Sequence, residues 1–313
     1  MKKIIIRPAD VTDAPAISAV HCSNIERWQI DEGQGRRPGR YADLTPYQRW
    51  LHGGAWMDVE TCAYHLGRLL NGGGIAWVAE VDGRVLAEAE LHPAIEPPPF
   101  GRTLNLSVLY VHRNHQRGGL GSALMEQALK LAEGCDTFTV SHAEAPDFYK
   151  KHGLKLAARY KRFQLPARTG RVRYTTEPLP DADYELVRGY ALPIGRYQNA
   201  HHDWERVRPN AVPDFPEWRH LRLERWWIMV RGQRAAIIFE ELQAGTANTF
   251  LFTPSPIEAI TDGRRVGEGV LSAIRDLAAR SRFNHLHCFA RTDLKLPGAV
   301  ATDYEHQLFM KQL

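Results

Sequence analysis

Hydrophobic and polar positions along this chain follow two spacings, and the changes between them predict a succession of short strands and helices. In the first half, apolar residues alternate with polar ones in segments bounded by turn residues, which indicates strands. These expected strands are Lys3–Arg7, Ile75–Val81, Arg84–His92, Leu104–Val111, Thr137–Ser141 and Lys155–Leu165. Helical spacing predicts a helix capped by Asp10 or Thr12 and running to Arg27, and others at Thr45–Leu51, Asp58–Leu70 and Ser122–Glu133. Asp82-Gly83 predicts a tight hairpin turn.

The same order of elements recurs after a polar, proline-containing stretch at 166–180, which we interpret as a linker. The expected elements are strands at Arg171–Thr176, Trp226–Val230, Arg234–Leu242, Thr249–Thr253, His285–Phe289 and Tyr304–Lys311, and helices at Asp183–Leu192 and Val266–Arg280. Gly232-Gln233 is the expected turn of the second hairpin. The pattern therefore predicts one domain at 1–165 and a divergent copy at 181–313, whose first strand begins near residue 171.

A glycine-rich turn between an expected strand and helix is the stretch most suggestive of chemistry. It reads Gln116-Arg117-Gly118-Gly119-Leu120-Gly121 and is followed by Ser122. The first N–H groups of a helix have no intrahelical partners and carry partial positive charge, so glycines that let a ligand approach them can create a site for a pyrophosphate. A lone turn of this kind is also compatible with a flexible helix start that binds nothing.

The wider context resembles the GCN5-related N-acetyltransferase (GNAT) family. Strand, Val111, four residues, Gln116-x-x-Gly119-x-Gly121 and helix resemble motif A of that family, and Ala145 through Phe148-Tyr149 to Gly153-Leu154 resemble its motif B. The opening Ile6-Arg7-Pro8-Ala9 is also similar, whereas His142 stands where the family often has Asn. The resemblance implies an α/β fold with a mixed, mostly antiparallel sheet flanked by helices in each of two GNAT-like domains, and acetyl-CoA as cosubstrate.

The resemblance also implies roles for individual residues. Backbone groups of Leu109, Tyr110 and Val111 would hold the thioester arm, and the turn from Gln116 to Ser122 would hold the pyrophosphate. Tyr149 stands at the general-acid position, and the alternative is a tyrosine that only packs. The acceptor site would include Trp28, Arg37, Arg40 and Tyr41, in or next to a polar, glycine-containing stretch expected to be a mobile loop. A solvated basic loop is the alternative there.

The general base is less defined by the sequence. Glu88, Glu90 and His92 alternate along one expected strand and so share one face of the sheet. Either carboxylate could accept a proton from the acceptor amine, directly or through water. A solvated sheet face would explain the same pattern. His201, His202, His285, His287 and Cys288 have no spacing typical of a metal site, so no metal is expected.

Composition narrows the remaining choices. The net charge is +4 and both signs are interspersed, which gives no indication of nucleic-acid binding. The four cysteines are far apart, and the sequence shows no signal peptide or membrane-spanning run, so a cytoplasmic protein without membrane attachment is expected. It could be a monomer or a homodimer.

These observations favour an N-acetyltransferase that acts on a small-molecule amine or a protein amino group, by direct attack in a ternary complex. A non-catalytic acyl-CoA-binding regulatory protein on the same fold is the alternative, and a longer acyl-CoA or an O-acceptor remains open. The second half is expected to have lost the chemistry. Its counterpart turn, around Arg264-Arg265-Val266-Gly267-Glu268-Gly269, carries Glu268 in place of Leu120, and Asp293 to Gly298 replaces Phe148-Tyr149.

Overall fold

The computed structural model describes residues 3–31, 33, 35–141, 145–254 and 265–313, with the side chains of 265–268 left out. The chain forms two compact units. The first comprises Met1–His92, Leu106–Glu133 and Asn210–Trp218, and the second comprises Pro93–Asn105, Gly134–Pro209 and Arg219–Leu313. Each combines strands and helices, which confirms the predicted fold class.

The first unit contains four of the expected strands, two that were not expected, and the four expected helices, the first of them shorter than predicted. Its strands are β1 (Ile4–Pro8), β2 (Gln29–Asp31), β3 (Arg36–Pro38), β4 (Ile75–Val81), most of β5 (Arg84–Glu96) and the end of β6 (Gly101–Val111). Its helices are α1 (Ala14–Cys22), α2 (Pro46–Trp50), α3 (Val59–Asn71) and α4 (Leu120–Leu131), with short 3₁₀ turns at Val11–Asp13, Tyr41–Asp43, Gly54–Met57, Arg113–His115 and Pro216–Trp218. Side-chain caps from Thr45 and Asp58 begin α2 and α3.

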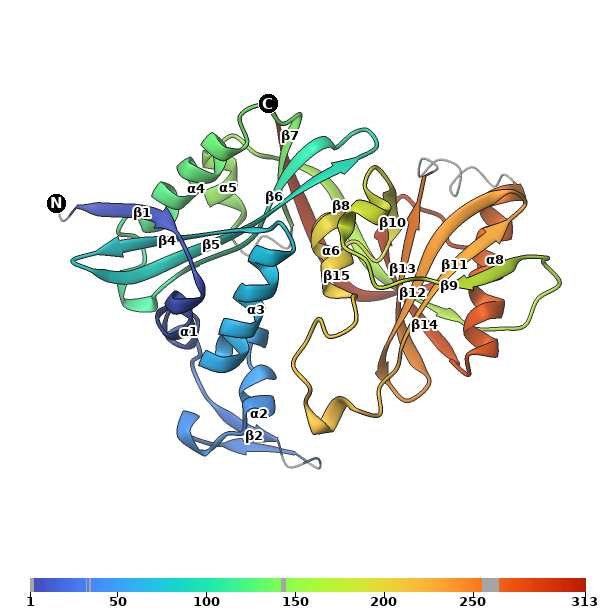
Figure 1. Cartoon of the computed structure of the whole chain (residues 1–313), viewed down its shortest axis with the longest axis horizontal. Helices are drawn as coiled ribbons and strands as arrows, with labels where there is room; N and C mark the ends of the chain where they lie inside the picture. Colours follow the sequence, from blue (N-terminus) through green and yellow to red (C-terminus); the bar gives the residue numbers. More distant parts are fainter. Residues whose placement is uncertain (1–2, 32, 34, 142–144, 255–264) are drawn as a thin grey trace. The chain divides into compact units, whose positions relative to one another are not determined.

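Strand pairing in the first unit follows the order β1-β4-β5-β6. β4 and β5 are antiparallel, with Val78 opposite Glu88 and Ala76 opposite Glu90. Asp82 and Gly83 form the turn between them at φ angles of 51° and 72°, as the sequence predicted. Figure 1 shows α4 on one side of β4 and β5 and α3 on the other. A core that includes Ile17, Leu66 and Val78 fills the layer beneath α1 and α3.

The second unit is built around a larger sheet, in the order β7-β15-β8-β14-β13-β12-β11-β9, with β10 pairing with β13. These strands are β7 (Thr137–Ser141), β8 (Lys155–Pro166), β9 (Thr175–Pro178), β10 (Ala191–Ile194), β11 (Leu223–Val230), β12 (Gln233–Gln243), β13 (Thr246–Thr253), β14 (His285–Arg291) and β15 (Val300–Gln312). The helices are α5 (Pro146–Lys151), α6 (Ala200–Arg206) and α8 (Arg265–Arg280), with a 3₁₀ turn at Tyr184–Val187.

Most pairs in this sheet are antiparallel, including β11–β12, β12–β13 and the two pairs made by β15, whereas β13 and β14 are parallel. β15 lies between β7 and β8, so the last strand of the chain completes a sheet that the first half begins. β12 is buried on both faces. Ile237 and Phe239 pack into a core with α8, and Ile238 packs into a second core with Trp204 of α6.

Four sequence predictions were wrong in detail. The expected mobile loop at Gln29–Arg40 contains the β2–β3 hairpin, and the first helix ends at Cys22 rather than Arg27. The expected helix at Asp183–Leu192 is a 3₁₀ turn followed by the unpredicted strand β10. The turn of the second hairpin is formed by Arg231 and Gly232, one residue earlier than expected. The boundary between two repeats at 166–180 stays a prediction.

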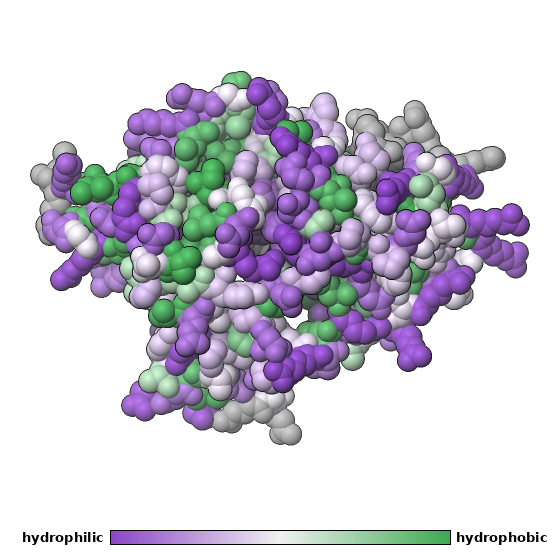
Figure 2. Space-filling view, in the orientation of Figure 1, coloured by the Kyte–Doolittle hydropathy of each residue, from purple (hydrophilic) through white to green (hydrophobic). Residues whose placement is uncertain are grey.

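Hydrophilic residues cover most of the face drawn in Figure 2, and hydrophobic residues form smaller groups among them. Within the part of the chain that the structure describes, no helix is both long and apolar enough to cross a membrane.

Candidate functional site

The glycine turn of the first unit leaves the start of α4 open. Residues 116–119 are exposed, and α4 begins at the buried Leu120. Gly119 has a φ angle of 89°, a conformation that glycine adopts without strain, and Arg117 has a φ angle of 62°. Among the described residues, no side chain caps the helix start. The first N–H groups of α4 thus lack a side-chain partner there, and their binding of an anion stays a prediction.

Asn24 holds this turn in place. Its Nδ2 donates to the carbonyl oxygen of Val111 at 3.2 Å, and its Oδ1 accepts from Gln116 Nε2 at 2.9 Å. The Ser23 hydroxyl oxygen accepts from the backbone N–H of Arg113 at 2.9 Å. Gln116 thus has a role in fixing the loop, and the predicted cofactor-binding residues on both sides of the turn are tied to the end of α1. The sequence did not predict this role for Asn24.

The other predicted cofactor-binding residues surround this turn. Leu109 and Val111 are half-buried at the end of β6, and Tyr110 between them is 39% exposed. A Cβ atom added at Gly118 would lie 3.2 Å from the carbonyl oxygen of His115, so a side chain fits tightly there. Gly121 and Ser122 lie in the first turn of α4.

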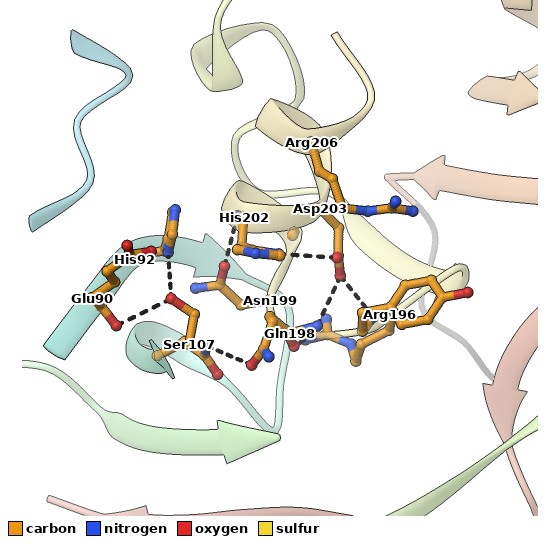
Figure 3. Close-up of polar contacts among 12 residues, drawn as sticks. Glu90, His92, Ser107, Arg196, Gln198, Asn199, His202, Asp203 and Arg206 are labelled. Carbon is orange, nitrogen blue, oxygen red and sulfur yellow. Dashed lines mark hydrogen bonds and ion pairs between the residues drawn. The ribbon is translucent and has the colours of Figure 1, made fainter. Parts of the chain in front are cut away.

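The candidate bases on β5 are buried, so the alternative of a solvated sheet face is wrong. Glu88, Glu90 and His92 are 1%, 2% and 5% exposed. Burying a carboxylate is costly unless it is paired and hydrogen-bonded, so each needs partners. The Ser107 hydroxyl lies 3.0 Å from His92 Nδ1 and donates to the backbone carbonyl of Glu90 at 3.0 Å (Figure 3).

Glu88 is paired with His21 of α1. The imidazole Nε2 makes a very short contact with Glu88 Oε1, and both side chains are almost completely buried. The second carboxylate oxygen, Oε2, is buried without a hydrogen-bond partner among the described residues. Burial raises the pKa of Glu88, and the nearby His21 opposes that rise without cancelling it.

Glu90 has a fuller set of partners. His65 Nε2 of α3 lies 3.0 Å from Oε2 and 3.1 Å from Oε1, and Trp56 Nε1 donates to Oε1 at 2.8 Å. Burial acts to raise the pKa of Glu90, but the charge and hydrogen bond of His65, with the Trp56 donor, outweigh it and lower that pKa. Burial likewise acts to lower the pKa of His65, and Glu90 raises it. Each partner therefore favours the charged form of the other.

The two histidines were missed in the sequence, although a signal was present. His21 lies four residues after Ile17 on the inner face of α1, and His65 lies next to Leu66 on the inner face of α3. An ionisable side chain within the apolar stripe of an expected helix needs a buried partner. Glu88 and Glu90 are such partners.

Tyr149 lies in α5, within the second unit. Its ring is half-buried and packs edge-on against Phe148 at 5.2 Å and near Phe309 of β15 at 6.5 Å. Packing and a general-acid role are both compatible with these contacts. His142, the departure from motif B, lies outside the described residues, as do Arg264 and the side chain of Glu268.

The candidate acceptor residues differ in exposure. Trp28 packs edge-on against Tyr41 at 5.2 Å and His52 at 4.8 Å, and the guanidinium of Arg49 lies 4.1 Å from the centre of the Tyr41 ring. Arg37 and Arg40 are exposed, and Arg40 forms an ion pair with Asp43 at 2.9 Å. Their role in acceptor binding stays a prediction.

Among the described residues, no three His, Cys, Asp or Glu side chains are grouped to hold a metal ion.

Comparison with known proteins supports the family resemblance. Residues 72–155, which include β4, β5, β6 and the glycine turn, match the Acetyltransferase (GNAT) domain family. A protein of Mycobacterium tuberculosis named as a probable N-acetyltransferase is 28% identical over 192 residues, which is 60% of this chain and 93% of that protein.

Solved structures extend the likeness to the whole chain. A GCN5-related N-acetyltransferase from Anabaena variabilis is similar with a TM-score of 0.63 at 11% identity, over 99% of this chain and 73% of the other. A second, from Kribbella flavida, has a TM-score of 0.57 at 12% identity, over 100% of this chain and 71% of the other. At these identities the likeness is one of fold. Together with the family match, it confirms the resemblance to the GNAT acetyltransferases.

Proposed function

We propose that this chain, which carries a GNAT domain match over residues 72–155, transfers an acetyl group from acetyl-CoA to a primary amine by direct attack in a ternary complex. The observation that carries the proposal is the uncapped start of α4 behind Gly119, at the end of β6 and inside the matched segment. The exposed turn and Arg117 suit the pyrophosphate of the cofactor.

The carboxylates of β5 and Tyr149 of α5 fit the chemistry of this reaction. Bound acetyl-CoA would supply the acetyl group as a thioester. An aliphatic amine has a pKa of about 10.4, so its ammonium form must lose a proton before the nitrogen can attack. A carboxylate of β5 accepts that proton in our proposal, and the Tyr149 phenol donates one to the sulfur as the C–S bond breaks. The C–N bond forms at the same carbon.

Thiol release tests the function directly. The intact protein is incubated with acetyl-CoA and a panel of amines, polyamines, aminoglycosides, amino acids and peptide N-termini, and free thiol is measured. Acceptor-dependent release supports the proposal. Binding of acetyl-CoA without release, for every acceptor class, would favour the non-catalytic regulatory protein instead. The Gly119→Asp variant is the control, because it places a negative charge where the pyrophosphate is expected.

The acceptor is a small-molecule amine or a protein amino group in this proposal. Trp28, Arg37, Arg40 and Tyr41 remain the candidates for contact with it. The divergent copy at 181–313 is proposed to be non-catalytic.

A further inference from the structure

The two carboxylates of β5 lie two residues apart, yet their surroundings differ. Both oxygens of Glu90 contact His65, and Oε1 also accepts from Trp56. Glu88 has one partnered oxygen, next to His21, while Oε2 is buried without a partner in the described part of the chain. Glu90 therefore has its lone pairs committed, whereas Glu88 keeps one oxygen able to accept a proton.

His21 cannot turn away from Glu88, because aromatic rings cover both of its faces. The Trp56 ring is stacked on it at 5.0 Å with an interplanar angle of 9°, and the Tyr110 ring at 4.2 Å with an angle of 25°. Tyr110 belongs to the end of β6 that is expected to hold the thioester. His21 of the His21–Glu88 pair thus contacts a residue at the end of that strand.

The charged and titratable groups around Glu88 come from four elements. They are His21 of α1, Glu90 of β5, His65 and Cys62 of α3, and Tyr110 of β6, and the strand β4 places the apolar Val78 opposite. Two buried carboxylates so close cannot both ionise without cations beside them. His65 and Trp56 stabilise the charge on Glu90. The Glu88 carboxylate is then left with the imidazole of His21 as its hydrogen-bonding partner.

We propose that Glu88 is the proton acceptor of the acetyl transfer, and that His21 is a positioning residue that holds the Glu88 carboxylate and favours its ionised form. In this assignment of roles Glu90 and His65 form a fixed ion pair, and Trp56 donates a hydrogen bond to Glu90. The acceptor ammonium loses one proton, through a water molecule, to Glu88 Oε2, and the freed nitrogen lone pair forms the new C–N bond as the C–S bond breaks. The thiolate takes its proton from Tyr149, and the second proton that the nitrogen loses restores the Tyr149 phenol. Glu88 later returns the proton to water. The inference rests on the proposed function and assigns its base.

The pH profile of kcat/KM tests the division of roles. His21→Gln removes the group that favours the ionised form of Glu88, so the acidic limb should move upward by about one pH unit or more. His65→Gln is the matched control, since it changes the partner of Glu90 and should shift that limb by less than half as much. Glu88→Gln should lose about 10²–10⁴-fold in kcat, as expected for a lost general base, and Glu90→Gln less than about tenfold. The reverse order would assign the base to Glu90 and overturn the inference.

A second measurement does not depend on activity. Carboxyl carbons of labelled glutamates are titrated by NMR in the intact protein, and Glu88 and Glu90 are assigned from their Gln variants. Glu88 should titrate at higher pH than Glu90, and its midpoint should rise further in His21→Gln. Equal midpoints, or a higher one for Glu90, would contradict the inference even if thiol release is observed. If no acceptor gives thiol release, the titration still decides whether the two carboxylates differ as proposed. Circular dichroism melts exclude unfolded variants.

Discussion

Two hairpins of the same form, one in each unit, bury opposite kinds of side chain. The β4–β5 hairpin turns at Asp82 and Gly83, and the β11–β12 hairpin turns at Arg231 and Gly232, all with positive φ angles. The first hairpin has a bulge between Ala79 and Glu80, so Glu88 lies in the fourth residue pair from the turn, and its counterpart in the second hairpin is Ala236. Glu88 is paired with His21, whereas Ala236 packs in an apolar core with Trp204 of α6. The same position thus holds a titratable group in one hairpin and hydrocarbon in the other.

The difference shows what a buried carboxylate requires. In the sixth residue pair from the turn, the first hairpin has Glu90 and the second has Ile238, and both are buried. Glu90 is compensated by His65 and Trp56, while Ile238 packs among apolar side chains. Paired acids in a core are costly to keep, so their presence at these two positions of the first hairpin favours a functional rather than a structural origin.

The two halves of the chain also differ in the segment that follows β7 in the first half and β14 in the second. Beyond β7, α5 presents Phe148 and Tyr149. Beyond β14, the described residues 292–299 form turns without a helix, and Leu294 and Leu296 are buried in the core. This stretch includes Pro297, a residue poorly suited to the interior of a helix. The second half of the chain supplies packing where the first half supplies a tyrosine.

The largest expected effect is at Tyr149. If its phenol protonates the sulfur, Tyr149→Phe should lower kcat by about 10²–10⁴-fold with little change in the affinity for acetyl-CoA, because packing is kept and the proton is lost. Steady-state kinetics and calorimetry measure the two quantities. Tyr304→Phe on β15 is the matched control, and as a partly exposed position it should stay within about twofold of wild type. A Tyr149 variant as active as this control would leave Tyr149 with a packing role only.

Placing a carboxylate inside the second hairpin should destabilise the protein. Ile237→Glu puts a carboxylate into the apolar core between β12 and α8, and should lower the free energy of unfolding by about 3 kcal/mol or more. Ile237→Val should cost only about 1 kcal/mol. Urea unfolding measures both. An Ile237→Glu protein as stable as the Val variant would show that the second hairpin can also hold a charged group, and the contrast between the hairpins would fail.

A smaller effect is expected at Glu241, where the second hairpin does carry a paired acid. Arg222 Nε donates to Oε2 at 2.9 Å and Gly245 N–H to Oε1 at 3.0 Å, and these hydrogen bonds lower the pKa of Glu241 from 4.5 to about 2. Because the folded pKa is depressed, the stabilisation is present above pH 4.5 and is lost as the pH falls toward 2.

Glu241→Gln should therefore narrow the difference in urea midpoint between pH 7 and pH 3. The change should be modest and reduced by salt, since Arg222 is 38% exposed. An unchanged midpoint difference would show that the ion pair adds no measurable stability.

Local patterns in the sequence predicted much of the fold. Alternation and turn residues located β4, β5 and β7, and the Asp82-Gly83 turn is where it was expected. Predictions failed where distant contacts override local preference. The Tyr184 hydroxyl donates to the carbonyl of Ile95, 89 residues away, and the segment that follows pairs with β13 instead of forming a helix.

The site was predicted only in part, because distant contacts also determine its geometry. The glycine turn and the β5 carboxylates carry their own local signals. The apolar stripe of α1 indicates that His21 is buried but not which residue pairs with it, because Glu88 is 67 residues away. Asn24 holds Val111 across 87 residues, and no local pattern predicts that contact.

The number of acetyl-CoA molecules bound per chain tests most directly the claim that only the first half of the chain, at 1–165, keeps the chemistry. The intact protein is required, because β15 pairs with both β7 and β8 and a fragment would lose that strand. Titration calorimetry should give one equivalent for the wild type and none for Gly119→Asp. Gly83→Asp, another open position with positive φ, should still bind one. Two equivalents in the wild type, or one retained in Gly119→Asp, would contradict the account.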